Sequence, residues 1–93
     1  MTLKIFKYPL NVQTVNTVSA PIVKPLRVDF QNGTANLWAI VDTDAPDKTF
    51  QVLCIGTGQQ VHFNINTIDY LNSTIIAEGR LVFHWFIRLP KEG

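Results

Sequence analysis

The sequence has one cysteine, few charged residues and no long apolar run, and each absence excludes a class of protein. A single cysteine, Cys54, cannot form an internal disulfide. Only 16% of residues are charged, the net charge is +1, and the basic residues are spread from Lys4 to Lys91. Binding of a nucleic-acid polymer needs several basic contacts on one face, so we do not expect it. No apolar run approaches the roughly 20 residues that span a bilayer. We therefore expect a cytosolic protein without a membrane segment.

Residues that carry catalysis or hold metals are also scarce. His62 and His84 have no thiolate or carboxylate set at zinc-ligand spacing. Neither serine lies in a G-x-S-x-G elbow, and no nucleophile has a base beside it in the sequence. The acidic stretch at 42–48 lacks the glycine and the glutamate of an EF-hand loop, which favours a solvated loop. We expect no enzyme, no metal site and no cofactor, with Cys54 a small buried hydrophobe.

Apolar residues, in contrast, are abundant for so short a chain. Hydrophobic residues make up 46% of the 93 positions, which is one domain spanning residues 1–93. A domain of this size buries only about two-thirds of its unfolded surface. Burial of one face of each subunit against another copy would use the remaining apolar surface, so we expect a homo-oligomer, a dimer or tetramer with closed symmetry.

The hydrophobic pattern predicts six to eight short strands and almost no helix. Residues 2–8 alternate and end at Pro9, and a β-leaning stretch with Val12, Val15 and Val18 closes at Pro21. Further strands are expected at 37–41, which reads as covered on both faces, at 49–55, and in a hairpin of 70–77 and 80–89 across Glu78-Gly79. Residues 59–68 have no clean period and are expected to be irregular.

One turn signal stands out among these strands. Leu26, Val28 and Phe30 are expected on one face of a strand, and Asn32-Gly33 after them is a strong hairpin signal. Short strands joined by tight turns indicate an all-β fold, a small antiparallel β-sandwich or barrel.

The last predicted strand has two unlike faces. Alternation places one set of side chains in the core: Leu81, Phe83, Trp85 and Ile87. The opposite face mixes basic, aromatic and imidazole groups: Arg80, Val82, His84, Phe86 and Arg88. Such a face suits a subunit interface, or a pocket for a flat anionic ligand, and the two coincide if the ligand sits between subunits.

The glycine pair in "CIGTGQQ" raises a second ambiguity. Gly56-Thr57-Gly58 lacks the spacing and the lysine of a P-loop and the third glycine of a dinucleotide fingerprint. Turn chemistry alone explains two glycines here. They would also permit a concave run of backbone N–H groups, a nest suited to phosphate. Both interpretations remain open from the residues.

Four segments together resemble a known family. "IFKYPL", "VDFQNGTANLWAIVDTDAP", "IGTG" and "YLNSTIIAEGRLVFHWF" are similar to a large family of small, mostly phage-encoded proteins catalogued as a domain of unknown function. The resemblance covers Ile5 to Phe86. Family members often carry His-Pro after G-T-G, where this chain has Gln59-Gln60. The pattern is also similar to one class of anti-CBASS proteins, oligomeric sponges that sequester cyclic dinucleotides such as 3′3′-cGAMP.

The resemblance implies a phage protein in the host bacterial cytoplasm that binds an immune signal and does not degrade it. The residues expected to contact such a ligand are Tyr8, Trp38, Gly56, Thr57, Gly58, Arg80 and His84. Aromatic rings would stack on bases, and arginine would hold a phosphate. Each also has a plainer interpretation: a core tryptophan, a rim tyrosine, a solvated turn arginine or an interface histidine. The alternative function is a structural phage protein or a module that inhibits a host protein by binding it.

Overall fold

The protein folds into seven strands and one short 3₁₀ helix in its computed structural model, which describes residues 1–90. The last three positions of the predicted 1–93 domain lie outside the described residues. The elements are β1 (Leu3–Leu10), β2 (Val15–Ala20), β3 (Ile22–Gln31), β4 (Thr34–Asp42), β5 (Lys48–Gly56), η1 (Ile65–Thr67), β6 (Asp69–Ile76) and β7 (Leu81–Arg88). The prediction of an all-β fold with six to eight strands is confirmed.

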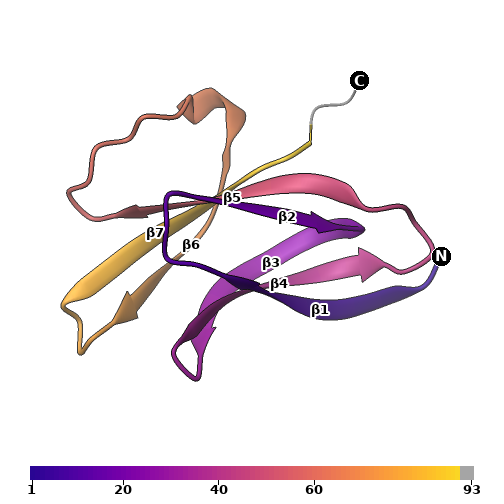
Figure 1. The fold of residues 1–93 in the computed structure, drawn as a ribbon, viewed down its shortest axis with the longest axis horizontal. Coiled ribbons are helices and arrows are strands. Elements are labelled where there is room, and N and C mark those ends of the chain that lie inside the picture. The colour runs from indigo at the N-terminus through magenta and orange to yellow at the C-terminus, as the bar shows by residue number, and fades with distance from the viewer. Residues whose placement is uncertain (91–93) are drawn as a thin grey trace.

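The strands form two antiparallel sheets (Figure 1). One has three strands in the order β1-β4-β3, and the other has four in the order β2-β5-β7-β6. The fold is thus a sandwich, with the apolar inner faces packed together as in other two-sheet domains. The core is formed by Leu10, Val18, Ala20, Ile22, Val28, Ala35, Leu37, Ala39, Val41, Phe50, Val52, Cys54, Trp85 and Ile87.

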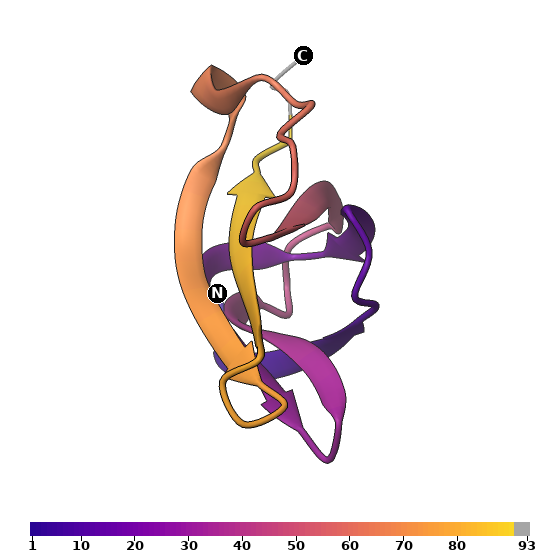
Figure 2. The ribbon, with the colours of Figure 1, turned by 90° about the vertical axis from the view of Figure 1, so that its left-hand side faces the viewer.

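The two sheets approach each other most closely along one side. The β6–β7 hairpin stands beside β3 there (Figure 2). A bulge between Tyr70 and Asn72 interrupts the pairing of β6 with β7. Next to it, the side chain of Asn72 bonds the backbone of Val28 in β3. This contact joins the edge strands of the two sheets.

Several predicted strand limits and turns agree with the structure. The Asn32-Gly33 turn joins β3 to β4, and both residues have the positive φ, 52° and 79°, of a type I′ hairpin turn. The β6–β7 hairpin closes through residues 77–80. Residues 57–68 form the long loop at the upper left of Figure 1, irregular except for η1.

The prediction that the first strand ends at Pro9 is wrong. β1 continues through Pro9 to Leu10, and Pro9 lies opposite Asn36 of β4. β1 is an edge strand, paired with β4 on one side only. On an edge strand, one side of the backbone has no partner strand. A proline whose ring nitrogen points to that side removes no hydrogen bond of the ladder, so the strand can continue beyond it.

Two predictions about strand faces also need correction. β4 is not covered on both faces: Ala35, Leu37 and Ala39 are buried on the inner side, whereas Trp38 and Ile40 on the outer side are half-buried. No second layer lies over that outer face in the described residues. In β3 a bulge between Pro25 and Arg27 breaks the alternation.

The β3 bulge separates residues that were predicted to share a face. Val28 is fully buried, whereas Leu26 remains 39% exposed. The core face predicted for the last strand is confirmed for Trp85 and Ile87, but Leu81 is 47% exposed because it begins β7 at the hairpin end, outside the core cluster.

Candidate functional site

The glycine pair forms a tight turn at the end of β5. The N–H of Gln59 donates to the carbonyl of Gly56 over 3.0 Å. Gly58 has φ +88° at the third position of this turn, a value that glycine adopts at no steric cost. Type II turns require this conformation, so the turn interpretation of "IGTG" is confirmed.

The amides of this turn are not spare, as the nest prediction required. The N–H of Gly56 donates to Oε1 of Gln59 over 2.5 Å. The N–H of Thr57 donates to the carbonyl of Val82 over 3.1 Å. The prediction of a concave run of open amides is therefore wrong for two of its three members, because the chain itself supplies acceptors. Gln59, which stands where family members often carry histidine, provides one of them.

Thr57 instead contributes its hydroxyl to a side-chain network. Its Oγ1 lies 2.7 Å from Nε2 of His84 in β7. The other ring nitrogen of His84, Nδ1, lies 2.8 Å from Oγ of Ser73 in β6. The Ser73 hydroxyl in turn lies 2.7 Å from the Tyr70 hydroxyl. Four polar side chains from the turn, β7 and β6 thus form one continuous hydrogen-bonded row.

A surface hollow of about 520 Å³ adjoins this row, and we call it the Thr57 hollow. It is lined by Gly56, Thr57, Gln59, Arg80, Leu81, Val82 and Phe83. Arg80 is held by its backbone turn: its Nε donates to the carbonyl of Ala77 over 3.3 Å. The carboxylate of Glu78 is 4.0 Å from the guanidinium, and the Arg80 side chain is 79% exposed. The guanidinium therefore sits at the rim and retains donors for a ligand.

Five of the seven predicted ligand residues come together here. Gly56, Thr57 and Arg80 line the hollow, Gly58 completes the turn, and His84 bonds Thr57. Tyr8 and Trp38 do not join them, since they lie in β1 and β4 of the other sheet. The predicted set is therefore divided between the two layers of the sandwich.

Tyr8 is half-buried and packs against the core from β1. Burial, and secondarily the carboxylate of Asp47, raises the pKa of its phenol above the ordinary value. Its place beside the core fits the plainer interpretation of a strand residue near the rim better than that of a stacking platform.

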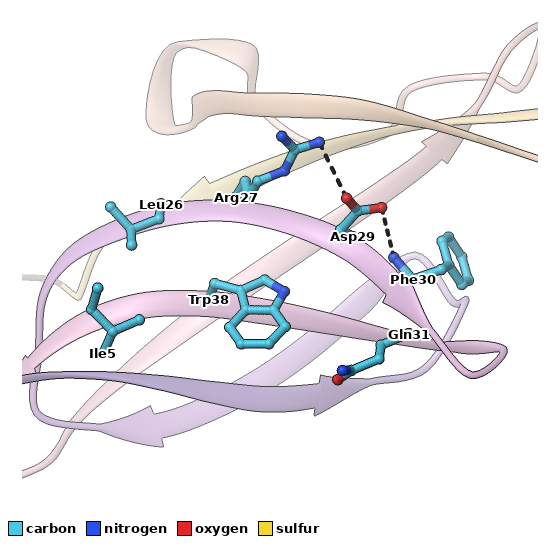
Figure 3. A pocket seen from close by; sticks show the side chains of 7 residues that line it. All are labelled: Ile5, Leu26, Arg27, Asp29, Phe30, Gln31 and Trp38. Atoms are coloured by element: carbon cyan, nitrogen blue, oxygen red, sulfur yellow. Dashed lines mark hydrogen bonds and ion pairs between the residues drawn. The ribbon is translucent and has the colours of Figure 1, made fainter.

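Trp38 lines a different surface hollow of about 430 Å³ on the outer face of the three-stranded sheet (Figure 3). We call it the Trp38 hollow; its lining is Ile5, Leu26, Arg27, Asp29, Phe30, Gln31 and Trp38. The ammonium of Lys7 lies 5.6 Å from the ring centroid of Trp38 and donates to Gln31 over 2.6 Å. A cation thus already occupies the neighbourhood of this indole, which disfavours stacking of a base on the same face.

The mixed face predicted for the last strand makes aromatic and polar contacts within the chain. Phe86 makes edge-to-face contacts with Phe63, at 6.0 Å between centroids, and with Tyr70, at 5.6 Å. Arg88 donates to Gln51 over 2.7 Å. The two aromatic contacts anchor the long loop at 57–68 through Phe63 and hold Tyr70 in place beside the hydrogen-bonded row.

Ser73, Tyr70 and Gln59 were not predicted to belong to the site. Counting back from the β6–β7 turn places Ser73 directly opposite His84. Opposite residues of an antiparallel pair point to the same face. The register of the predicted hairpin could therefore have identified Ser73 as a neighbour of His84. For Tyr70 the bulge in β6 shifts the register, so the same count fails.

The acidic stretch between β4 and β5 stabilises its own loop. The carboxylate of Asp42 accepts from the N–H of Asp44 over 3.0 Å and of Thr2 over 3.1 Å. These two amides lower the pKa of Asp42. In residues 1–90 no three His, Cys, Asp or Glu side chains gather as metal ligands would. Within the same residues, no helix has the length and apolar character to cross a membrane.

The sequence comparison adds a family to this geometry. Residues 1–92 match the family described as Domain of unknown function (DUF7352). The chain belongs to this family. The match covers nearly the whole chain, including the turn at Gly56 and both strands of the β6–β7 hairpin. No curated protein matches the sequence, and no solved structure matches it.

Proposed function

We propose that this DUF7352 protein is a phage anti-defence sponge, which binds a cyclic dinucleotide of CBASS immunity in the host bacterial cytoplasm and leaves it intact. The observation that carries the proposal is the Thr57 hollow, where Arg80 stands at the rim beside the hydrogen-bonded pair of Thr57 and His84. A guanidinium and a hydroxyl are suitable donors for phosphate oxygens.

Arg80 supplies the charge that the ligand needs. Its ion pair with Glu78 is long, at 4.0 Å, and both side chains are exposed. Such surface pairs contribute little, so exchange of Glu78 for a phosphate costs little. A guanidinium offers two parallel N–H groups to two oxygens of one phosphate, which a lysine does not.

The hollow also offers apolar area for a base. Leu81, Val82 and Phe83 line it, and the ring of Phe83 is half-buried. A volume of about 520 Å³ falls within the usual range for small-molecule sites, roughly 300–1,000 Å³. The hollow lies open at the surface of one subunit. We therefore propose that it holds one half of a two-fold ligand while a second copy holds the other half.

The outer face of the three-stranded sheet supports the proposal of an assembly. Ile5 is 61% exposed there, and Leu26 and Trp38 lie beside it in the Trp38 hollow. Apolar surface of this kind is commonly covered in oligomers. A dimer or tetramer would bury it, and light scattering coupled to size-exclusion chromatography measures the subunit number directly.

The same outer face favours the second candidate function, a structural or inhibitory module that binds another protein and no nucleotide. Arg27 and Asp29 beside apolar Ile5 and Leu26 give the face the polar rim of a protein-binding surface. This candidate places the binding surface on the opposite layer from the Thr57 hollow, so variants on the two layers distinguish the two functions.

A thermal-shift screen tests the sponge against this alternative. The purified protein is heated with cyclic di- and trinucleotides, with linear nucleotides as controls. A ligand that binds only the folded state stabilises it by about 4 kcal/mol at a thousandfold excess over its dissociation constant. We expect a shift of several degrees with one cyclic species, reduced in Arg80→Ala and retained in Lys24→Ala, an exposed cation of the other sheet that lines neither hollow. No shift with any cyclic species would overturn the sponge proposal.

A further inference from the structure

The row Tyr70–Ser73–His84–Thr57 can carry its hydrogens in either of two directions. In one, Tyr70 donates to Ser73, Ser73 to Nδ1 of His84, and Nε2–H of His84 to Thr57. In the other, each donor becomes an acceptor. A hydroxyl has one hydrogen and a neutral imidazole has one N–H. A hydroxyl oxygen also accepts up to two bonds, so Ser73 could accept from both Tyr70 and Nδ1–H, and the direction of the first bond alone does not set the others.

The chemistry of Tyr70 and the burial of Ser73 together decide the arrangement. A phenol is a more acidic hydroxyl than that of serine and is the better donor of the pair. Its ring contacts Phe86 edge-to-face, which holds it in position. With Tyr70 as donor, donation from Ser73 to Nδ1 is the favoured arrangement. The alternative would leave the hydrogen of half-buried Ser73 without a partner, whereas the spare hydrogen of exposed Thr57 can reach water or a ligand. The imidazole then carries its hydrogen on Nε2, because the bond to one nitrogen sets the tautomer of the other.

The last hydroxyl of the row is the one that meets the ligand. Thr57 accepts from Nε2–H in this direction, so its own hydrogen has no partner within the row. Thr57 lines the hollow together with Arg80. Hydrogen bonds that run in one direction polarise one another, which strengthens the terminal donor.

We infer that Tyr70 and Ser73 are positioning residues that hold His84 as its Nε2–H tautomer, so that Thr57 donates its hydroxyl hydrogen to an oxygen of an anionic, phosphate-bearing ligand. The inference rests on the proposed function for the identity of that ligand. In this arrangement Thr57 offers the ligand a donor, which suits ester and phosphate oxygens.

The tautomer is measured first in the protein without ligand. Nitrogen-15 NMR of the histidine side chains distinguishes Nε2–H from Nδ1–H and reports a hydrogen bond at the bare nitrogen. We expect His84 as the Nε2–H form with a hydrogen-bonded Nδ1. In Ser73→Ala the Nδ1 resonance moves to its water-exposed value, and Ser73→Thr restores it because the hydroxyl returns. An Nδ1–H tautomer in the wild type, or an unchanged Nδ1 resonance in Ser73→Ala, would overturn the inference.

Binding is measured next with 3′3′-cGAMP and with inorganic pyrophosphate. Ser73→Ala is expected to weaken binding of either probe about three- to tenfold, as for the loss of one hydrogen bond, and Ser73→Thr to recover it. If pyrophosphate binds at Thr57 while 3′3′-cGAMP and the other nucleotides do not, the sponge proposal fails and the inference stands. Equal binding of both probes by wild type and Ser73→Ala would contradict the inference, even with the nucleotide bound.

Discussion

The side chain of Asn72 in β6 makes the two hydrogen bonds with the backbone of Val28 in β3 that a neighbouring strand would otherwise make. Its Oδ1 accepts from the Val28 N–H over 2.8 Å, and its Nδ2 donates to the Val28 carbonyl over 2.7 Å. Val28 is fully buried, so water does not reach its backbone easily. One amide thereby satisfies both polar groups of a buried residue and joins the edges of the two sheets.

Replacement of this amide should lower stability strongly. Asn72→Ala leaves a buried N–H and a buried carbonyl without their partner, each at a cost of about 1–3 kcal/mol. We expect the free energy of unfolding in urea to fall by about 2–4 kcal/mol. Asn66→Ala, in the exposed 3₁₀ segment, serves as the control and should change it little. Similar losses in both variants would show that the bridge is not what stabilises this edge.

A buried bond at Trp85 gives a second stability prediction. Its Nε1 donates to Oγ1 of Thr74 over 2.9 Å, and both residues are buried. Thr74→Val preserves the shape but removes the acceptor, so the indole N–H is left without a partner, at a cost of about 1–3 kcal/mol. Thr17→Val, on the exposed face of β2, is the matched control. Urea denaturation followed by tryptophan fluorescence measures both, and equal stability of the two variants would contradict the prediction.

Cys54 should make the protein less stable in alkali. Burial raises the pKa of its thiol to about 11, above the value of about 8.5 expected for the unfolded chain. Between these values the unfolded state loses the proton first, so the free energy of unfolding falls as pH rises. Below about pH 8 both states keep the proton and the effect vanishes.

The prediction is tested with a variant that cannot titrate at this position. Unfolding of wild type and Cys54→Ala is compared at pH 8 and pH 10.5 with reductant present. Cys54→Ala should start lower, because it removes buried volume, but should lose less stability between the two pH values. Equal losses would show that the thiol ionises as easily in the folded protein as in the unfolded chain.

Two of the glycines with left-handed backbone should separate stability from binding. Gly58 has φ +88° and Gly33, in the β3–β4 turn of the other sheet, has φ +79°, and an added Cβ meets no atom within 4 Å at either position. Alanine at either site is strained by about 1–2 kcal/mol. We expect Gly58→Ala and Gly33→Ala to lower the melting temperature equally, whereas only Gly58→Ala, in the turn beside Thr57, weakens nucleotide binding. Equal nucleotide binding by both variants would show that the turn at Gly58 does not contribute to the binding site.

The sequence predicts those features of the fold that depend on neighbours in the chain. Asn32-Gly33 identifies its hairpin because few residues adopt positive φ. Alternation around Trp85 identifies a core face because the period of a strand is two. These signals act over a few residues, and the structure agrees with them.

Features that depend on the partner of a strand are not encoded so locally. β4 and β5 are consecutive, yet the chain crosses between sheets at 42–48, so Trp38 and Thr57 lie in different layers. No local pattern predicts this crossing, so the sequence did not show that Tyr8 and Trp38 lie in the other sheet from Arg80. The bulge at Pro25 and the acceptors of the Thr57 amide likewise depend on contacts distant in sequence.

The most direct test of the sponge proposal is to ask what happens to the ligand. The protein is incubated with the cyclic dinucleotide that shifts its melting temperature, passed through a desalting column, and denatured by heat, and the released nucleotide is analysed by chromatography. The proposal predicts that the nucleotide travels with wild-type protein, in lower amount with Arg80→Ala, and is recovered intact. Recovery of a linear or cleaved product, or no nucleotide in the protein fraction, would contradict it.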